Sequence, residues 1–347
     1  MKEIAIITHY DLSIFRGGEK FIINLANALS NIGCKVRIYS YPFKRGKVNV
    51  RKYLLKDVEY ISDFSFKKID ADTSYYIYAP LVYKIFLKDK SQKKIAGLHG
   101  FVIIPELSSQ DVWNINPIRF YKLHGLKALF AYYYEKIMRK RDLNNFDFIH
   151  IINPYMKYFL PNSLIQKTVY IPLWTNYLND NFVRKESEND KFTILILGSN
   201  NYLKGKDICE KILQYFHNKK EIEILSNVQF NNKKIKLLEF IKEEEMPKFL
   251  SSVNVLLYPS RLDTFGLTII ESLNCGTPVI TSDILAHKIF SYPVILCSTL
   301  QDYLKNILKL FHIWKEGLYS IIRKKALLEG KKFSKDQVFP KYRDFLC

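Results

Sequence analysis

The sequence predicts an α/β protein with two domains, each built around a parallel sheet. Short, nearly continuous apolar runs at residues 4–7, 192–197 and 253–258 have the length and composition of buried parallel strands. Each run is followed by a polar loop and then by apolar residues at helical spacing, which is the order of a βαβ unit. The chain of 347 residues also exceeds the size at which one hydrophobic core stops growing, so two domains are expected.

The composition is that of a globular protein, with 48% hydrophobic and 25% charged residues. No apolar run reaches the roughly 18 residues of a membrane-spanning helix. The N-terminus has too short an apolar run, and acquires acids too soon, for a signal peptide, and it is expected to form the first strand of the fold. The five cysteines are widely spaced without a CxxC pair, and the seven histidines show no ligand spacing. These patterns predict reduced thiols in a cytoplasmic protein, without a disulfide framework or a metal site.

The formal net charge is +19, and most of it lies in the first half. Residues 1–170 carry 27 Lys and Arg against 14 Asp and Glu, a net charge of +13, whereas the rest carry 26 against 20, a net charge of +6. This excess predicts a polyanionic partner, such as a phospholipid surface, a lipid phosphate or a nucleic acid. A general bias toward Lys, Ile, Asn and Tyr is the alternative explanation.

The first half begins with a βαβ unit that contains two adjacent glycines. A strand at residues 4–7 leads through a polar loop to Gly17 and Gly18, an apolar helical pattern follows over residues 21–33, and residues 36–39 form the next strand. Glycines in such a turn occur in nucleotide-binding α/β domains, although tight turns also need them for steric reasons alone.

His99 stands directly after a predicted strand at residues 93–98. Ligands of open α/β sheets bind at the carboxyl ends of the strands, so this position suits a side chain that contacts a ligand. A lone histidine is otherwise more often structural, and His99 is therefore a candidate site residue.

Residues 117–141 predict a basic, aromatic, amphipathic helix. Such a helix could lie on an anionic membrane, or it could pack its apolar stripe on its own domain and leave its lysines in water. Strands at residues 148–152 and 169–172 close the first half, and the polar stretch at residues 176–190 is the expected linker.

The second half repeats the alternation of strand and helix. The strand at residues 192–197 ends in Gly198, Ser199 and Asn200, and the loop after it carries Lys204. The further elements expected are a helix at 208–216, a strand at 222–225, a helix at 246–250, a strand at 294–297, helices at 300–311 and 318–328, and a last helix at 334–346 that Pro340 interrupts.

Residues 259–278 form the stretch around which the chain is organised. A polar loop follows the strand at residues 253–258, and an apolar pattern from about Gly266 predicts a short buried helix. Residues 275–278 stop this helix, and another strand follows at once.

This stretch combines two carboxylates with helix N-terminal amides. Asp263 in the loop and Glu271 in the helix can face one crevice from two depths. The backbone N–H groups of Phe265, Gly266 and Leu267 lie where a helix N-terminus attracts an anion. Carboxylates for hydroxyls beside amides for phosphate fit a nucleotide-sugar site, while a plain βαβ crossover with solvated acids is the alternative.

Taken in chain order, these features resemble the retaining glycosyltransferases of family 4, also described as glycosyl transferases group 1. The resemblance is strongest over residues 240–283, clear over 3–40 and 192–206, and loose over 42–150. Its most specific part is a pair of acids separated by seven residues in a fixed frame, here Pro259-Ser260, Asp263, Phe265-Gly266-Leu267, Glu271 and Gly276-Thr277-Pro278.

The resemblance implies the GT-B fold, in which two Rossmann-like domains face each other across a cleft. Residues 1–175 would form the acceptor-side domain, residues 190–330 the nucleotide-sugar domain, and residues 331–347 a helix that packs back on the first domain. It further implies sugar transfer with retention of configuration from a nucleotide-diphosphate sugar to a glycan or lipid-linked acceptor, without a cofactor or a metal.

The resemblance also assigns roles to individual residues. Asp263 would hold the donor sugar, Glu271 the nucleotide ribose, and His99 would contact the sugar near the reacting bond. Lys204 would clamp the diphosphate and stabilise the charge of the leaving group. The implied catalytic residues are His99, Asp263 and Lys204, and the implied donor-binding residues are Gly17, Gly18, Gly198, Ser199, Lys204, Asp263, Phe265, Gly266, Leu267 and Glu271.

Two positions depart from the family pattern. Asp263 stands where the family usually has Glu, so its reach is one methylene shorter. Ser199 stands where the family usually has Arg, which loses a charged, fork-shaped donor. Asn200, Lys206 and Arg261 are candidates to replace it.

The expected partners are a nucleotide-sugar donor, a glycan or lipid-phosphate acceptor, and an anionic membrane surface on the cytoplasmic face. A GT-B enzyme that glycosylates nucleic acid or protein is a rival hypothesis, although the sequence contains no RRM, KH or zinc motif. A non-catalytic nucleotide-sugar-binding relative is another rival, which the two departures support.

Overall fold

The computed structural model divides into two compact units. The first unit holds the described residues up to Trp174 apart from Ser108, together with Lys335–Cys347, and the second holds Ser108 and Thr175–Ser334. Most of the predicted linker at residues 176–190 lies outside the described residues. The structure describes residues 1–40, 46–62, 68–77, 88–100, 108, 126, 130, 142–177, 191–230, 235–239 and 241–347.

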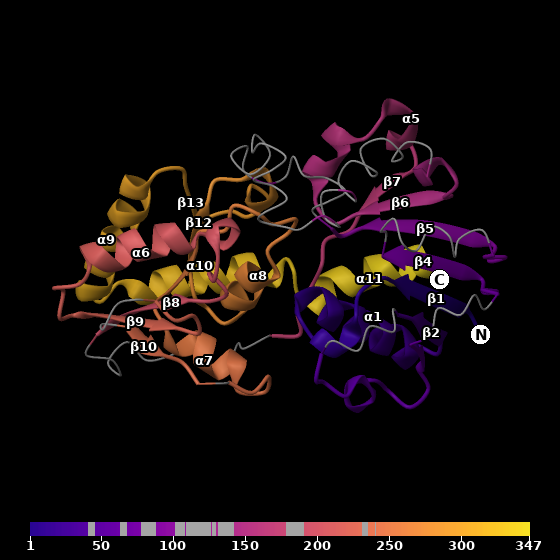
Figure 1. Ribbon diagram of the computed structural model, residues 1–347, viewed down its shortest axis with the longest axis horizontal. Helices are drawn as coiled ribbons and strands as arrows, with labels where there is room; N and C mark the ends of the chain where they lie inside the picture. The colour runs from indigo at the N-terminus through magenta and orange to yellow at the C-terminus, as the bar shows by residue number, and fades with distance from the viewer. Residues whose placement is uncertain are drawn as a thin grey trace. The chain divides into compact units, whose positions relative to one another are not determined.

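The first unit is built on a seven-stranded parallel sheet (Figure 1). Its strands are β1 Glu3–Thr8, β2 Lys35–Tyr39, β3 Glu59–Ile61, β4 Thr73–Ile77, β5 Lys93–Leu98, β6 Phe148–Ile151 and β7 Thr168–Tyr170. Their order in space is β3-β2-β1-β4-β5-β6-β7, so the direction of winding reverses between β1 and β4. Ligand sites of doubly wound sheets form at the carboxyl ends of the strands around such a reversal.

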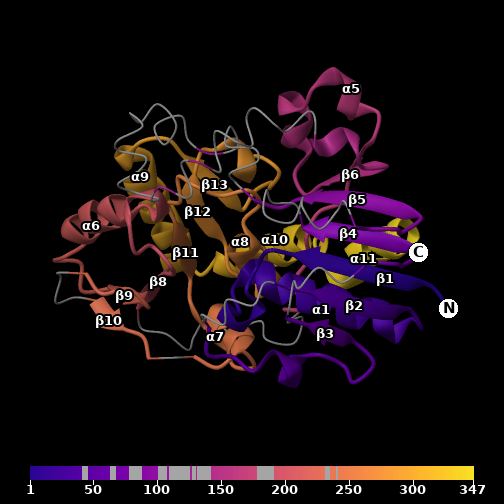
Figure 2. The ribbon, with the colours of Figure 1, turned by 45° about the vertical axis from the view of Figure 1, so that its right-hand side comes forward.

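The second unit is built on a six-stranded parallel sheet (Figure 2). Its strands are β8 Phe192–Ile196, β9 Ile222–Ser226, β10 Ile235–Leu237, β11 Val255–Tyr258, β12 Val279–Ser282 and β13 Val294–Cys297. The spatial order β10-β9-β8-β11-β12-β13 places the reversal between β8 and β11. Every residue of β8, β11 and β12 is buried, as expected for central parallel strands that helices cover on both faces.

Both units also contain helices. In the first unit they are α1 Gly17–Asn31, α5 Asn162–Ile165 and α11 Lys335–Leu346, and in the second α6 Lys206–Tyr215, α7 Met246–Ser252, α8 Leu267–Asn274, α9 Leu300–Lys315 and α10 Tyr319–Lys331. The predicted interruption of the last helix is wrong, because α11 continues through Pro340. This helix instead buries Val338, Tyr342 and Leu346 in the first unit.

The strand β4 was missed by the sequence pattern, and the reason lies in its residues. Its sequence TSYYI lacks an aliphatic run, yet all five residues are buried between β1 and β5. Tyr75 and Tyr76 are completely buried, and each hydroxyl has a hydrogen-bond partner. Buried tyrosines with satisfied hydroxyls therefore fill this part of the core, where a hydropathy pattern looks for Val, Ile or Leu. The short edge strands β3 and β10 were missed as well.

Among the described residues, no helix is both long and apolar enough to cross a membrane. Most of the amphipathic helix predicted at residues 117–141 lies outside them. Leu126 and Phe130 are the two positions of that segment that the structure describes. Both are helical, and they are 67% and 72% exposed.

Candidate active site

Two loops meet at the winding reversal of the second sheet. Residues 198–206 follow β8, and residues 259–266 follow β11, its neighbour in the sheet. The amide of Arg261 donates to the carbonyl of Leu203 over 2.8 Å, which ties the two loops together. The second unit therefore gathers its predicted site residues at the sheet edge where doubly wound proteins bind ligands.

The backbone around Lys204 is shaped by the residues on both sides of it. Asn201 caps a 3-10 helix at Tyr202–Lys204 by accepting a hydrogen bond from the amide of Lys204 over 3.1 Å. Gly205 ends this helix with a φ of +74°, and a Cβ there would lie 2.1 Å from the carbonyl oxygen of Pro259. Glycine is thus required for the close contact that holds Lys204 against the second loop.

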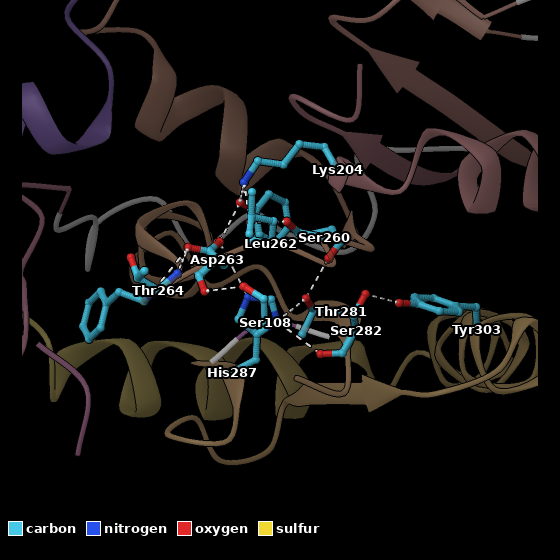
Figure 3. A network of polar contacts seen from close by, with 12 residues as sticks. Ser108, Lys204, Ser260, Leu262, Asp263, Thr264, Thr281, Ser282, His287 and Tyr303 are labelled. Atoms are coloured by element: carbon cyan, nitrogen blue, oxygen red, sulfur yellow. Dashed lines mark hydrogen bonds and ion pairs between the residues drawn. The ribbon is translucent and has the colours of Figure 1, made fainter. Parts of the chain in front are cut away.

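The ammonium group of Lys204 points at the loop after β11 (Figure 3). Its Nζ donates to the carbonyl of Leu262 over 3.0 Å and to the hydroxyl of Tyr258 over 3.3 Å. Burial lowers the pKa of Lys204, but the neighbouring Tyr258 and Asp263 outweigh burial and raise this pKa above its usual value. Lys204 is therefore a fixed positive charge at the site.

Asp263 directs its carboxylate into its own unit (Figure 3). Oδ1 accepts from the amides of Thr264 over 2.8 Å and Phe265 over 3.3 Å, and Oδ2 accepts from the hydroxyl of Tyr258 over 2.8 Å. The side chain is only 15% exposed. In this arrangement Asp263 braces the loop and balances the charge of Lys204.

His287 is a further member of this network that the sequence reasoning missed. Its side chain is fully buried, with Nδ1 near the carbonyl of Ser282 and the hydroxyl of Thr281, at 3.1 and 3.0 Å. Nε2 lies 3.6 Å from Oδ2 of Asp263. In the described part of the chain, no group of three or more His, Cys, Asp and Glu side chains is arranged to hold a metal ion.

The environment of Asp263 favours its ionised form. Burial alone would raise the pKa of this carboxyl group. The positive charge of Lys204, followed by the contacts with His287 and Tyr258, outweighs burial and holds the pKa far below its usual range. Asp263 is therefore a carboxylate at every pH at which the protein is expected to work.

Gly266 is the N-cap residue of α8 and has a φ of +98°. A Cβ at this position would lie 2.9 Å from Cδ1 of Ile269, so glycine is required for both conformation and space. The amide of Phe265, which was predicted to face an anion, donates to Asp263 instead. The ring of Phe265 packs in the core against Phe290 and Phe333. The first intrahelical hydrogen bonds of α8 are those from the amides of Ile269 and Ile270 to the carbonyl of Gly266, at 3.0 and 3.3 Å, so the amides of Leu267 and Thr268 precede them.

Glu271 lies one turn further along α8 and is half-buried. Its charge adds to burial in raising the pKa of Cys275 to about 12, and it also raises the pKa of Tyr177. The hydroxyl of Tyr177 donates to Glu243. Glu271 and Glu243 thus both act on Tyr177, which was not predicted from the sequence.

The structure also shows how the departure at Ser199 is accommodated. Ser199 is fully buried, so its side chain does not face a ligand in this arrangement. Of the proposed substitutes for the missing arginine, Arg261 pairs with both carboxylate oxygens of Asp207 at 2.7 and 2.9 Å and stacks over Tyr202. Lys206 lies over the ring of Phe230. Arg261 is thus a brace between the two loops, and the guanidinium is committed inside the unit.

Three predicted site residues lie in the first unit. Gly17 and Gly18 form the first two residues of α1 instead of the preceding turn, and neither has a positive φ. A Cβ on Gly18 would lie 3.3 Å from the ring of Tyr10, so this glycine allows a close side-chain contact. His99 follows β5 and is 7% exposed, with Nε2 2.7 Å from the hydroxyl of Tyr75.

The structure therefore brings Lys204 together with Asp263, Phe265 and Gly266, and places Gly198 and Ser199 in the loop after β8. His99, Gly17 and Gly18 lie at the carboxyl ends of strands in the other unit. His99 was predicted from its place directly after a strand, Asp263 from its place in the loop before a helix, and Lys204 from the family resemblance.

One family model matches a part of the chain that lies in the second unit. Residues 179–288 match the family model described as "Glycosyl transferases group 1". The O-antigen biosynthesis glycosyltransferase WclY of Escherichia coli is 43% identical over 53 residues, which is 15% of this chain and 14% of that protein. The O-antigen chain mannosyltransferase B of Escherichia coli is 34% identical over 50 residues, 14% of this chain and 13% of that protein.

The likeness in three dimensions extends over both units. The structure of HepE from Anabaena in complex with UDP and glucose superposes with a TM-score of 0.70 at 12% identity, covering 100% of this chain and 99% of that one. At this identity the likeness shows the fold alone. Residues 179–288 thus carry the sequence signature of glycosyl transferases group 1, and the chain as a whole has the GT-B fold, with two Rossmann-like units.

Proposed function

We propose that the protein is a retaining glycosyltransferase that moves a sugar from a nucleotide-diphosphate sugar to a glycan or lipid-linked acceptor. The observation that carries the proposal is the position of Lys204 beside the N-terminal loop of α8, at the winding reversal of a sheet whose sequence matches the group 1 model. Cleavage of a sugar–diphosphate bond places negative charge on the leaving group, and this arrangement supplies positive charge where it would develop.

The hydrogen bonding of Lys204 supports this role. An ammonium group has three N–H donors, and among the described residues Leu262 and Tyr258 accept from it. The third donor can serve a phosphate oxygen. Because Asp263 and Tyr258 keep the lysine charged and fixed, little reorganisation is needed when a diphosphate arrives, and no metal is required for charge neutralisation at this point.

The donor is best tested first as a UDP-sugar, because the similarly folded HepE was solved with UDP and glucose. We expect one nucleotide sugar from a panel of UDP-, GDP- and ADP-sugars to raise the melting temperature of the protein and to be hydrolysed slowly without an acceptor. If no member of the panel stabilises the protein, the proposal is wrong.

Two substitutions with matched controls locate the donor. Glu271→Gln should abolish the donor-induced stabilisation, whereas Glu244→Gln, an exposed acid of the same unit, should leave it unchanged. Lys204→Met should lower turnover, whereas Lys211→Met on the exposed face of α6 should not. Equal effects of Lys204→Met and Lys211→Met would mean that the diphosphate is held elsewhere.

A non-catalytic nucleotide-sugar-binding relative is the second candidate. It is favoured by the burial of Ser199 and by the pairing of Arg261 with Asp207, since neither can supply the family's usual arginine contact. Binding of a donor with no hydrolysis and no transfer to any glycan or lipid-linked acceptor would establish this candidate instead of the enzyme.

The acceptor is proposed to be a glycan built on a membrane lipid phosphate, and the protein to associate with the cytoplasmic membrane face. The names of both similar Escherichia coli proteins refer to the O-antigen, and residues 1–170 carry a net charge of +13. Leu126 and Phe130, both helical and four residues apart in the sequence, expose their apolar side chains. Flotation with anionic liposomes should be lost in a Leu126→Gln/Phe130→Gln variant, and binding to DNA in preference to liposomes would contradict this proposal.

A further inference from the structure

A chain of hydrogen bonds runs inward from His99 through the first unit. Nε2 of His99 lies 2.7 Å from the hydroxyl of Tyr75, and the same hydroxyl lies 2.7 Å from Nδ1 of His150. Nε2 of His150 in turn lies 2.8 Å from the carbonyl oxygen of Ile171. All three side chains are buried.

The direction of each hydrogen bond follows from the acceptor at the end of the series, the carbonyl of Ile171. The carbonyl of Ile171 can only accept, so Nε2 of His150 carries a proton. Burial lowers the pKa of His150 to about 4, so its ring is neutral and Nδ1 is an acceptor. Tyr75 must then donate to His150, and its oxygen is left to accept from Nε2–H of His99. The chain of bonds therefore selects one tautomer of His99, with the proton on Nε2 and the lone pair on Nδ1.

The sheet builds this chain through the register of three neighbouring strands, β4, β5 and β6, which lie side by side in Figure 2. Gly97 on β5 is paired with His150 on β6. A Cβ at Gly97 would lie 2.8 Å from the hydroxyl oxygen of Tyr75 and 2.7 Å from its ring. Glycine at this position leaves the space through which Tyr75 reaches both histidines.

The surroundings of these hydrogen-bonded residues keep the ring of His99 neutral. His9, which follows β1, acts on His99 electrostatically, and the hydroxyl of Tyr342 of α11 lies 3.3 Å from Nε2 of His150. Burial, followed by the influence of His150 and His9, lowers the pKa of His99 well below its usual value. His99 thus has no proton to give at Nδ1 near neutral pH.

We propose that Tyr75 and His150 are positioning residues for the sugar transfer, and that they act by holding His99 as its neutral Nε2–H tautomer. In this form Nδ1 of His99 is a hydrogen-bond acceptor, which is the role that contact with a sugar hydroxyl requires, and His99 does not act as a general acid. The role of these residues in catalysis rests on the proposed function. The tautomer of His99 does not depend on a bound nucleotide sugar and is measured without one.

The tautomer is tested by ¹⁵N NMR of the full chain labelled at histidine, with the His99 signals assigned by their loss in His99→Gln. We expect a protonated Nε2 and an unprotonated Nδ1 in the wild type from pH 8 to pH 6. Tyr75→Phe should release the tautomer and give a signal shared between the two ring nitrogens. A wild-type ring protonated at Nδ1 would overturn the proposal, whether or not any variant folds.

Tyr76→Phe is the matched control, because Tyr76 is equally buried on β4 but its hydroxyl donates to Asp89 over 2.8 Å. This variant should leave the tautomer of His99 unchanged. A shift of the tautomer in Tyr76→Phe equal to that in Tyr75→Phe would mean that general loosening of the sheet is responsible, and would refute the positioning role.

Kinetics with the donor identified above separates the two proposals. Tyr75→Phe should lower kcat by about 10- to 100-fold with a smaller change in KM, since a misplaced contact group costs rate more than binding. Unchanged kcat together with a released tautomer would refute the positioning role while leaving the proposed function intact. The fixed tautomer in a protein that turns over no nucleotide sugar would refute the proposed function and, with it, the catalytic meaning of the network.

Discussion

Removal of the charge of Asp263 is expected to destabilise the second unit strongly. Asp263→Asn keeps the size of the side chain and an oxygen that can accept from the amides of Thr264 and Phe265. It removes the negative charge that balances Lys204, whose ammonium group is held by Tyr258 and Leu262. The positive charge then remains half-buried without its counterion.

The expected magnitude follows from the contacts that survive. Loss of one partner of a buried ion pair costs about 3–5 kcal/mol. Because the new carboxamide in Asp263→Asn would retain the two amide contacts, we expect the lower end of this range or slightly less, about 2–3 kcal/mol in the free energy of unfolding. For a unit of roughly 150–250 residues this lowers the melting temperature by about 4–12 °C, measured by circular dichroism.

A double-variant cycle shows whether the charge itself is responsible. Lys204→Met combined with Asp263→Asn removes both charges, so the pair should be more stable than additivity of the single variants predicts, by about 1 kcal/mol or more. Asp283→Asn is the matched control, because Asp283 pairs with the exposed Lys288 at 3.3 Å. Asp283→Asn should lower the free energy of unfolding by about 0–1 kcal/mol. Equal destabilisation by Asp263→Asn and Asp283→Asn would refute the reasoning.

The pH dependence of this difference has a definite sign. The pKa of Asp263 is depressed in the folded protein, so the unfolded chain binds the proton more readily. The stabilisation is complete above the usual carboxyl pKa of about 3.9 and is lost as the pH falls toward the folded value. The gap in stability between wild type and Asp263→Asn should therefore narrow from pH 6 to pH 3. A constant gap over this range would show that the charge of Asp263 contributes nothing.

Two further substitutions test the bracing of the site loops. Arg261→Lys keeps the positive charge but loses the two-point contact of the guanidinium group with Asp207. It should lower the free energy of unfolding, measured by urea titration, by about 1–2 kcal/mol. An unchanged free energy of unfolding would mean that this two-point contact does not stabilise the protein. Gly266→Ala should lower the free energy of unfolding by about 1–3 kcal/mol, because both the φ of +98° and the contact with Ile269 disfavour a Cβ. Gly317→Ala should lower it less, because Gly317 has a φ of +72° but open space around a Cβ. A larger loss in Gly317→Ala would contradict the close packing inferred at Gly266.

The sequence allowed the alternation of strand and helix to be predicted because most strands are continuous apolar runs. It also allowed the loop of Asp263 to be predicted as a site, because two acids lie there beside helix N-terminal amides, whereas Lys204 was predicted only from the family resemblance. The order of the strands, with its reversal between β8 and β11, was not predicted, because pairing depends on packing between distant segments.

The partners inside each unit could not be predicted from sequence. His287 approaches Asp263 from a segment beyond β12, and Tyr75 reaches His99 only because Gly97 leaves space between them. The commitment of Arg261 to Asp207 likewise depends on how two loops meet. Each of these contacts joins residues that no local pattern relates, so only the three-dimensional arrangement reveals them.

The central claim is transfer of a sugar from a nucleotide-diphosphate donor with retention of configuration. Its most direct measurement is ¹H NMR of the purified protein with the nucleotide sugar that stabilises it, following the first sugar released or transferred. We predict release of the nucleoside diphosphate and a first product with the anomeric configuration of the donor, lost in Lys204→Met and kept in Lys211→Met. A first product of opposite configuration would contradict retention, and an unchanged donor spectrum would contradict the claim that the protein is a glycosyltransferase.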